Sequence, residues 1–197
     1  ELVRRDLLDL MSRKGKAPGG YCTYFPVAKR PFIFMNAVGL HDDVQTMLHE
    51  AGHAFHAFAS SDLPFAPQLE SPMEFNEVAS MAMELLAAPY LTADHGGFYD
   101  VGGAARARIE HLESTILFWP YMAVVDAFQQ WAYTHPEGAE PDACDAQWRA
   151  LVQRFIPAID FDGLDDVMAT GWHRKLHIFN VPFYYVEYGL AQLGAAQ

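Results

Sequence analysis

The chain has 197 residues, of which 51% are hydrophobic and 14% aromatic, so it can bury a sizeable core and is expected to form one domain over residues 1–197. Its formal net charge of −12 offers no basic surface for nucleic acid or an anionic membrane, and no apolar run is long enough to cross a bilayer, so neither partner is expected. Cys22 and Cys144 lie far apart, which predicts free thiols; together with the lack of a secretory leader this favours a cytoplasmic protein.

The N-terminal part predicts a short helix followed by a β-hairpin. Residues 2–11 have an amphipathic pattern, and the glycine-rich run 12–20 is expected to be a solvated connector. Residues 21–25 and 31–35 are rich in aromatic and β-branched side chains on either side of a turn, which predicts the hairpin. An edge strand can pair with an extended peptide, and residues 32–35 are the candidate; the alternative is a hairpin that serves only the core.

The next segment predicts a long helix that begins near residues 42–43, where an aspartate can cap it, and ends before the run 60–64. Its apolar residues recur at helical spacing and predict one buried stripe: Val44, Met47, Leu48, Ala51, Phe55 and Phe58. His49, His53 and His56 fall on the opposite side. The helix is therefore expected to expose a face that is rich in histidine.

The central motif on this helix is His49-Glu50-Ala51-Gly52-His53. Residues four apart on a helix project from the same face, so the two imidazoles can bind one metal ion. The alternative is a solvated face on which the histidines match the motif by chance. A glycine inside a helix costs about 1 kcal/mol relative to alanine, so Gly52 indicates that another part of the site approaches the helix there.

A second helix is predicted from Ser71-Pro72-Met73-Glu74, which combines a capping box with an early proline, to Pro89. Its expected buried stripe consists of Phe75, Val78, Ala79, Ala82, Leu85 and Leu86. Glu77, Ser80 and Glu84 share the opposite face. This face could therefore turn a carboxylate toward the two histidines.

Glu77 is the candidate for a third metal ligand. Two histidines and a glutamate, with one position left for water, form a known set in catalytic zinc sites. Glu70 and Glu74 are rivals, although Glu74 is expected to be engaged in capping. Glu84 could accept a hydrogen bond from a ligand histidine, or it could be an exposed acid.

The middle of the chain predicts helical architecture. Residues 92–103 are expected to connect to a long helix over 104–134, bent at Pro120, and another helix is predicted over 142–155. The expected buried side of the long helix consists of Ile109, Leu112, Ile116, Leu117 and Trp119. Together with the hairpin, these segments predict a mainly α fold with a small antiparallel sheet.

The last stretch combines a loop-like run over residues 172–180 with a helix that starts within 181–190 after an early proline. Tyr185 and Tyr188 are three residues apart and project from neighbouring positions on this helix. Aromatic stripes usually belong to a core. Here, however, a core would have to satisfy the polar hydrogens of three tyrosines and a histidine within a dozen residues.

Three separated blocks of the chain resemble one family. They are His49–His56, Phe75–Glu84 and the run from His177 through Pro182–Tyr188, in this order. They resemble the M3 family of zinc oligopeptidases, and within it the oligoendopeptidase F branch. The resemblance extends from about Pro18 to the end, corresponds to the catalytic part of the family, and implies a zincin-like metallopeptidase domain.

The resemblance implies one bound Zn²⁺ per chain with three ligands: His49, His53 and Glu77. It implies that Glu50 is the general base that activates water. It further implies that His177, Tyr185 and Tyr188 surround the reacting carbonyl, and it leaves open which tyrosine stabilises the negative charge. The implied activity is that of a zinc metalloendopeptidase acting on short peptides.

Family members also have a helical N-terminal part that walls a deep channel and restricts substrates to short peptides. That part has no counterpart here, so we expect the catalytic portion of a longer peptidase, with the missing N-terminal segment as a partner. Two other classes remain. One is a non-catalytic metal-binding or interaction fragment, and the other is an iron(II) oxygenase, which also uses two histidines and a carboxylate.

Overall fold

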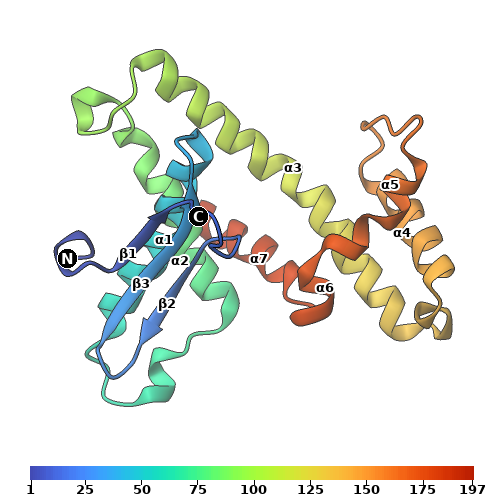
Figure 1. Cartoon of the computed structure of the whole chain (residues 1–197), viewed down its shortest axis with the longest axis horizontal. Coiled ribbons are helices and arrows are strands. Elements are labelled where there is room, and N and C mark those ends of the chain that lie inside the picture. The colour runs from blue at the N-terminus through green and yellow to red at the C-terminus, as the bar shows by residue number, and fades with distance from the viewer. The chain divides into compact units, whose positions relative to one another are not determined.

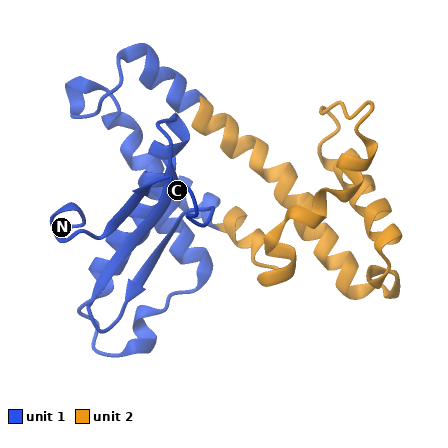
Figure 2. Ribbon diagram, viewed as in Figure 1, with its two compact units in different colours: residues 1–109, 191–197 blue, residues 110–190 orange.

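The computed structural model describes residues 1–197 and divides into two compact units (Figure 2). The first unit contains residues 1–109 and 191–197, and the second contains residues 110–190. The elements, shown in Figure 1, are strands β1 (Leu8–Met11), β2 (Tyr21–Phe25) and β3 (Arg30–Ala37) and helices α1 (His41–Ser60), α2 (Met73–Ala87), α3 (Val101–Thr134), α4 (Pro141–Phe155), α5 (Asp165–Ala169), α6 (Leu176–Asn180) and α7 (Tyr185–Ala196). The fold is mainly helical with one small sheet, as predicted. No helix combines the length and apolarity that a bilayer span requires.

The sheet of the first unit has the strand order β1-β3-β2. Strands β2 and β3 pair antiparallel, which confirms the predicted hairpin, and β1 adds to the other side of β3 in parallel. Alternate side chains of β3, those of Pro31, Ile33 and Met35, are buried. Helix α1 packs against this sheet.

Two expectations about these strands are wrong. Residues 2–11 do not form a helix but a short 3₁₀ turn, Val3–Arg5, followed by β1. Leu8 and Leu10, two residues apart, both pack on the buried cluster around Ile33, so this apolar run follows the period of a strand. Residues 32–35 are not an edge strand either, because β3 pairs on both sides and the edges of the sheet are β1 and β2.

Helices α1 and α2 approach each other closely at Gly52. A Cβ atom on Gly52 would lie 2.5 Å from the Cα atom of Ser80 and 2.6 Å from the carbonyl oxygen of Ala79. Ser80 is fully buried, and its hydroxyl donates to the backbone oxygen of Glu77 at 2.9 Å. The close approach that the glycine predicted is therefore a contact between these two helices.

The most deeply buried residues of α1 and α2 are not those predicted from hydrophobicity. The buried residues on these two helices are Glu50, Gly52, Ala54, Glu77 and Ser80. In contrast, Phe55 and Phe75 from the expected stripes are 55% and 61% exposed. The helices pack through their smallest residues, so the polar faces that carry the motifs are enclosed between them.

The start of α2 also differs from the prediction. The capping box at Ser71 is absent, because the Ser71 hydroxyl donates to the side-chain oxygen of Asn76, and Pro72 precedes the helix without a side-chain cap. Helix α1 does use an aspartate at its start. The carboxylate of Asp43 accepts hydrogen bonds from the backbone N–H groups of residues 38–40.

The second unit has a separate core formed by the later part of α3 together with α4. Val124, Val125 and Phe128 of α3 pack with Trp148 and its neighbours on α4. The predicted helices over 104–134 and 142–155 are both present. However, four residues of α3 that were predicted to be buried are exposed: Ile109, Leu112, Ile116 and Leu117. The core forms instead around residues further along the helix.

The stretch before α7 is helical rather than loop-like. Thr170–Arg174 forms a 3₁₀ turn and Leu176–Asn180 forms α6. Phe183 then adopts a left-handed backbone with φ of 64°. The fully buried side-chain oxygen of Gln129 accepts a hydrogen bond from the Phe183 N–H at 2.8 Å, which holds this turn before α7.

The contact between α1 and α2 can be tested with Gly52→Ala. We expect the free energy of unfolding to fall by about 1–3 kcal/mol, because the added methyl group overpacks the interface. Urea unfolding followed by circular dichroism measures this change. Gly102→Ala in α3 is the matched control, since a Cβ atom there meets nothing closer than 3.6 Å, and we expect no loss. Equal stability of the two variants would contradict a tight contact.

Candidate metal centre

The structure brings together three of the residues that the sequence singled out. Nε2 of His49 lies 3.2 Å from Oε2 of Glu77, and Nε2 of His53 lies 3.7 Å from the same oxygen. The ligand atoms of all three residues lie within 4.8 Å of one another. Two consecutive turns of α1 thus supply the imidazoles, and the buried face of α2 supplies the carboxylate.

These three donors fit a zinc ion. Atoms bound tetrahedrally to zinc at about 2.0–2.1 Å lie about 3.3 Å apart, and the observed separations of 3.2 and 3.7 Å from Glu77 are close to that value. Two histidines and one glutamate leave a fourth position for water or substrate. His56, Glu70 and Glu74, which share the neighbouring sequence, do not belong to this group.

Glu84 forms a hydrogen bond with Nδ1 of His49, the ring nitrogen that faces away from Glu77. Its Oε1 atom lies 2.7 Å from Nδ1 of His49, so of the two alternatives for Glu84 the structure has the hydrogen bond to this histidine. With Nδ1 as the donor, the lone pair of Nε2 is directed to the side of Glu77. Burial acts to lower the pKa of His49, but the hydrogen bonds and charges of Glu77 and Glu84 outweigh it and raise this pKa to about 10. The two carboxylates therefore stabilise positive charge at this position, which a proton on His49 or a metal ion in place of that proton can supply.

His53 experiences the opposite balance. Burial lowers its pKa, and the nearby carboxylate of Glu77 only partly opposes this effect. Its imidazole therefore favours the neutral form, which is the form that binds a metal ion.

Glu50 lies beside the metal group and is only 6% exposed. Burial and the charges of Glu77 and Glu84 raise the pKa of Glu50 to about 7, against the effect of His49. The backbone N–H of Cys22 on β2 donates to its carboxylate, and the backbone at Gly20 passes close by. A carboxyl group with this pKa can accept and release a proton near neutral pH.

The remaining predicted residues cluster in the second unit. The ring of His177 lies 5.1 Å from that of Tyr185 and 6.0 Å from that of Tyr188, and the two tyrosine rings are 5.6 Å apart. Tyr184 joins them, with its ring 4.9 Å from Tyr188. The pattern-based reasoning omitted Tyr184, although the adjacent tyrosines in the sequence offered a signal. Burial raises the pKa of Tyr185, so its hydroxyl keeps its proton.

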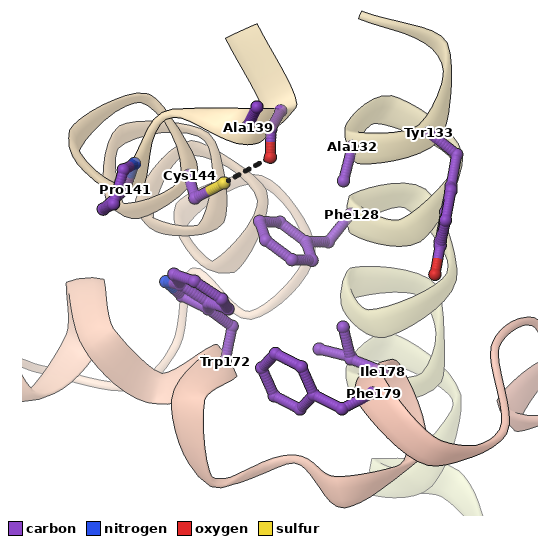
Figure 3. A pocket seen from close by; sticks show the side chains of 10 residues that line it. Phe128, Ala132, Tyr133, Ala139, Pro141, Cys144, Trp172, Ile178 and Phe179 are labelled. Carbon is purple, nitrogen blue, oxygen red and sulfur yellow. Dashed lines mark hydrogen bonds between the residues drawn. The ribbon is translucent and has the colours of Figure 1, made fainter. Parts of the chain in front are cut away.

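The second unit also contains an apolar pocket of about 330 Å³ (Figure 3). Phe128, Trp172, Ile178 and Phe179 line it, together with Cys144, whose thiol donates to the Gly138 carbonyl. None of the residues that the sequence singled out as site residues lines this pocket.

Comparisons with known proteins show which family the chain is similar to. The model of peptidase family M3 matches residues 1–197. PZ peptidase A, solved with an inhibitor, has a TM-score of 0.88 and 36% sequence identity to this chain. The match covers 98% of this chain and 34% of the PZ peptidase A chain. A structure assigned to oligoendopeptidase F has a TM-score of 0.89 and 36% sequence identity, and the match covers 98% of this chain and 34% of that one. A structure assigned to oligoendopeptidase F from Bacillus anthracis str. Ames has a TM-score of 0.79 and 34% sequence identity, and the match covers 98% of this chain and 30% of that one. The chain thus spans about a third of these solved chains, and a search of curated proteins gave no match.

The role of Glu84 can be tested through metal affinity. We expect Glu84→Gln to weaken zinc binding about 10- to 100-fold, because His49 loses the carboxylate that orients its ring and increases its basicity. Competition with a chromogenic chelator measures the affinity. Glu74→Gln on the same helix is the control and should leave it unchanged. If the two variants bind zinc equally well, Glu84 does not orient the ligand.

Proposed function

We propose, because this chain belongs to peptidase family M3, that it is the catalytic portion of a zinc metalloendopeptidase that hydrolyses short peptides. The convergence of His49, His53 and Glu77 from two helices, with Glu50 beside them, is the observation that carries the proposal. Residues 1–197 would act as one zincin-like catalytic domain. Membership of a peptidase family argues against the iron oxygenase alternative.

One zinc ion per chain, held by His49, His53 and Glu77, would act as a Lewis acid on the peptide carbonyl and make a water molecule acidic. Glu50 would take the proton of that water and deliver it to the leaving amine. A buried carboxyl group with a pKa of about 7 suits both transfers. Glu50 itself is not a ligand in this proposal, since it projects about 100° around the helix from His49.

The edge strand β2 replaces residues 32–35 as the candidate for holding the peptide backbone. It pairs with β3 along one side, and no strand pairs with its other side. The N–H of Cys22 reaches the carboxylate of Glu50, so β2 passes beside the proposed base. A peptide that adds to this edge as a further strand would bring its backbone near Glu50.

His177, Tyr185 and Tyr188 would donate hydrogen bonds to the reacting carbonyl as its oxygen becomes negative. Each such donor typically contributes about 3 kcal/mol to transition-state stabilisation. The family resemblance of this segment supports the proposal. So does the burial of Tyr185, which raises its pKa and keeps the hydroxyl as a donor at neutral pH.

A second function remains open because the chain spans about a third of its solved relatives. In that case it would be a non-catalytic metal-binding or interaction fragment. Such a fragment would bind zinc without hydrolysing peptides, so metal content and turnover measured on the same preparation distinguish the two functions.

Glu50→Gln is expected to retain zinc and the fold but to lower peptide hydrolysis by about 10²–10⁴-fold, because the proton acceptor is lost. A quenched fluorogenic peptide pool reports turnover, and atomic absorption reports zinc. Glu74→Gln serves as the control for a neutralised glutamate outside the centre. Unchanged turnover in Glu50→Gln would eliminate Glu50 as the base.

Tyr185→Phe and Tyr188→Phe are expected to lower kcat more than they raise KM, because the hydroxyl would act mainly in the transition state. Steady-state kinetics on one cleaved peptide measures both constants. Tyr133→Phe, at a tyrosine that is 60% exposed in the same unit, is the control and should change neither. If both replacements are silent, the two tyrosines serve only the core.

A further inference from the structure

Two adjacent cations of the second unit, Arg174 and Lys175, have no acidic partner. The ammonium of Lys175 lies 3.9 Å from the ring centre of Tyr185 and 5.2 Å from that of Tyr121. Neither basic side chain takes part in the ion pairs of the structure.

A second basic cluster, that of Arg13 and Lys16, is neutralised. Arg13 and Lys16 both bind the carboxylate of Asp9, at 2.6 and 3.0 Å. Lys16 also donates to two backbone oxygens, of Asp9 and Met11, at 3.0 Å each. Arg174 and Lys175 differ from this cluster, because no carboxylate forms an ion pair with either of them.

The unpaired arrangement has an energetic cost. Burial and the neighbouring charge of Arg174 lower the pKa of Lys175 to about 8. The tyrosine faces compensate partly, since a cation is attracted to the face of an aromatic ring. They do nothing for the repulsion between the two cations. An anion bound to both would remove this repulsion and pair the desolvated ammonium.

We propose that Arg174 and Lys175 bind a carboxylate of the substrate peptide. The inference rests on the proposed function, because Lys175 touches Tyr185 and precedes His177 by two residues, and both are assigned to the reacting carbonyl. The preferred substrates would then be peptides with a negative charge near the cleaved bond. The carboxylate is either an acidic side chain or the C-terminus of the peptide, which share the same chemistry.

Matched peptides test the preference. Pairs of quenched peptides carry glutamate or glutamine at positions around the cleaved bond, and a second series compares a free C-terminus with an amide. We expect the charged member to have about fivefold higher kcat/KM, the gain of one partly exposed ion pair. The series in which the charged member has the higher kcat/KM identifies which carboxylate is bound.

Variants link the preference to the two cations. Arg174→Gln combined with Lys175→Met should reduce the ratio of the two kcat/KM values to about one, whereas Lys175→Arg, which keeps the charge, should retain most of it. Arg154→Gln is the matched control, because its guanidinium also lies over an aromatic ring, that of Phe155 at 5.0 Å, in the same unit. No preference in the parent chain, or one that survives the double replacement, would overturn the proposal.

A binding measurement separates this inference from the proposed function. Fluorescence anisotropy of labelled glutamate and glutamine peptides with Glu50→Gln reports recognition without turnover. If no peptide is hydrolysed by the parent chain but the acidic peptide binds about fivefold more tightly through residues 174 and 175, recognition stands and the peptidase proposal fails. If hydrolysis occurs and the two peptides bind equally, the peptidase proposal stands and carboxylate recognition fails.

Discussion

The contact between α1 and α2 at Gly52 is the constraint on which the candidate metal centre depends. The imidazoles belong to one helix and the carboxylate to the other, so the distance between the helix axes sets the distance between the ligands. With Gly52 against Ser80, Glu77 comes within 3.2 Å of His49. Any larger side chain at Gly52 would separate the two halves of the ligand set, which explains a glycine in mid-helix despite its cost of about 1 kcal/mol.

The same contact determines the electrostatics. It encloses Glu50, Glu77 and Glu84 with two histidines, where charges are poorly solvated. The carboxylates of Glu77 and Glu84 raise the pKa of His49. Burial lowers the pKa of His53 and raises the pKa of Glu50. One histidine therefore tends to hold a positive charge beside two carboxylates while the other stays neutral. Such a group of side chains is suited to a divalent cation, which neutralises the carboxylates and uses both nitrogens as ligands.

The sequence predicts the helices and the spacing of the histidines better than it predicts their surroundings. Periodicity locates α1, α2 and α4, and the four-residue spacing of His49 and His53 depends only on local geometry. Hydrophobicity, however, selects Phe55 and Phe75 as buried, whereas the interface uses Gly52 and Ser80, because small residues allow close packing without being strongly apolar. The central position of β3 results from its pairing with β1, a distant contact that a short run of leucines does not reveal.

Recognition of an acidic peptide by Arg174 and Lys175 would have to act against the charge of the whole chain. A net charge of −12 repels an anionic peptide at long range, so it slows the encounter. The local attraction acts within the Debye length, about 8 Å at physiological ionic strength. Added salt would then weaken both effects at once, reducing the repulsion on approach and the attraction after docking. A preference for acidic peptides in this chain is therefore a property of the bound state, and it depends on the two side chains rather than on the overall field.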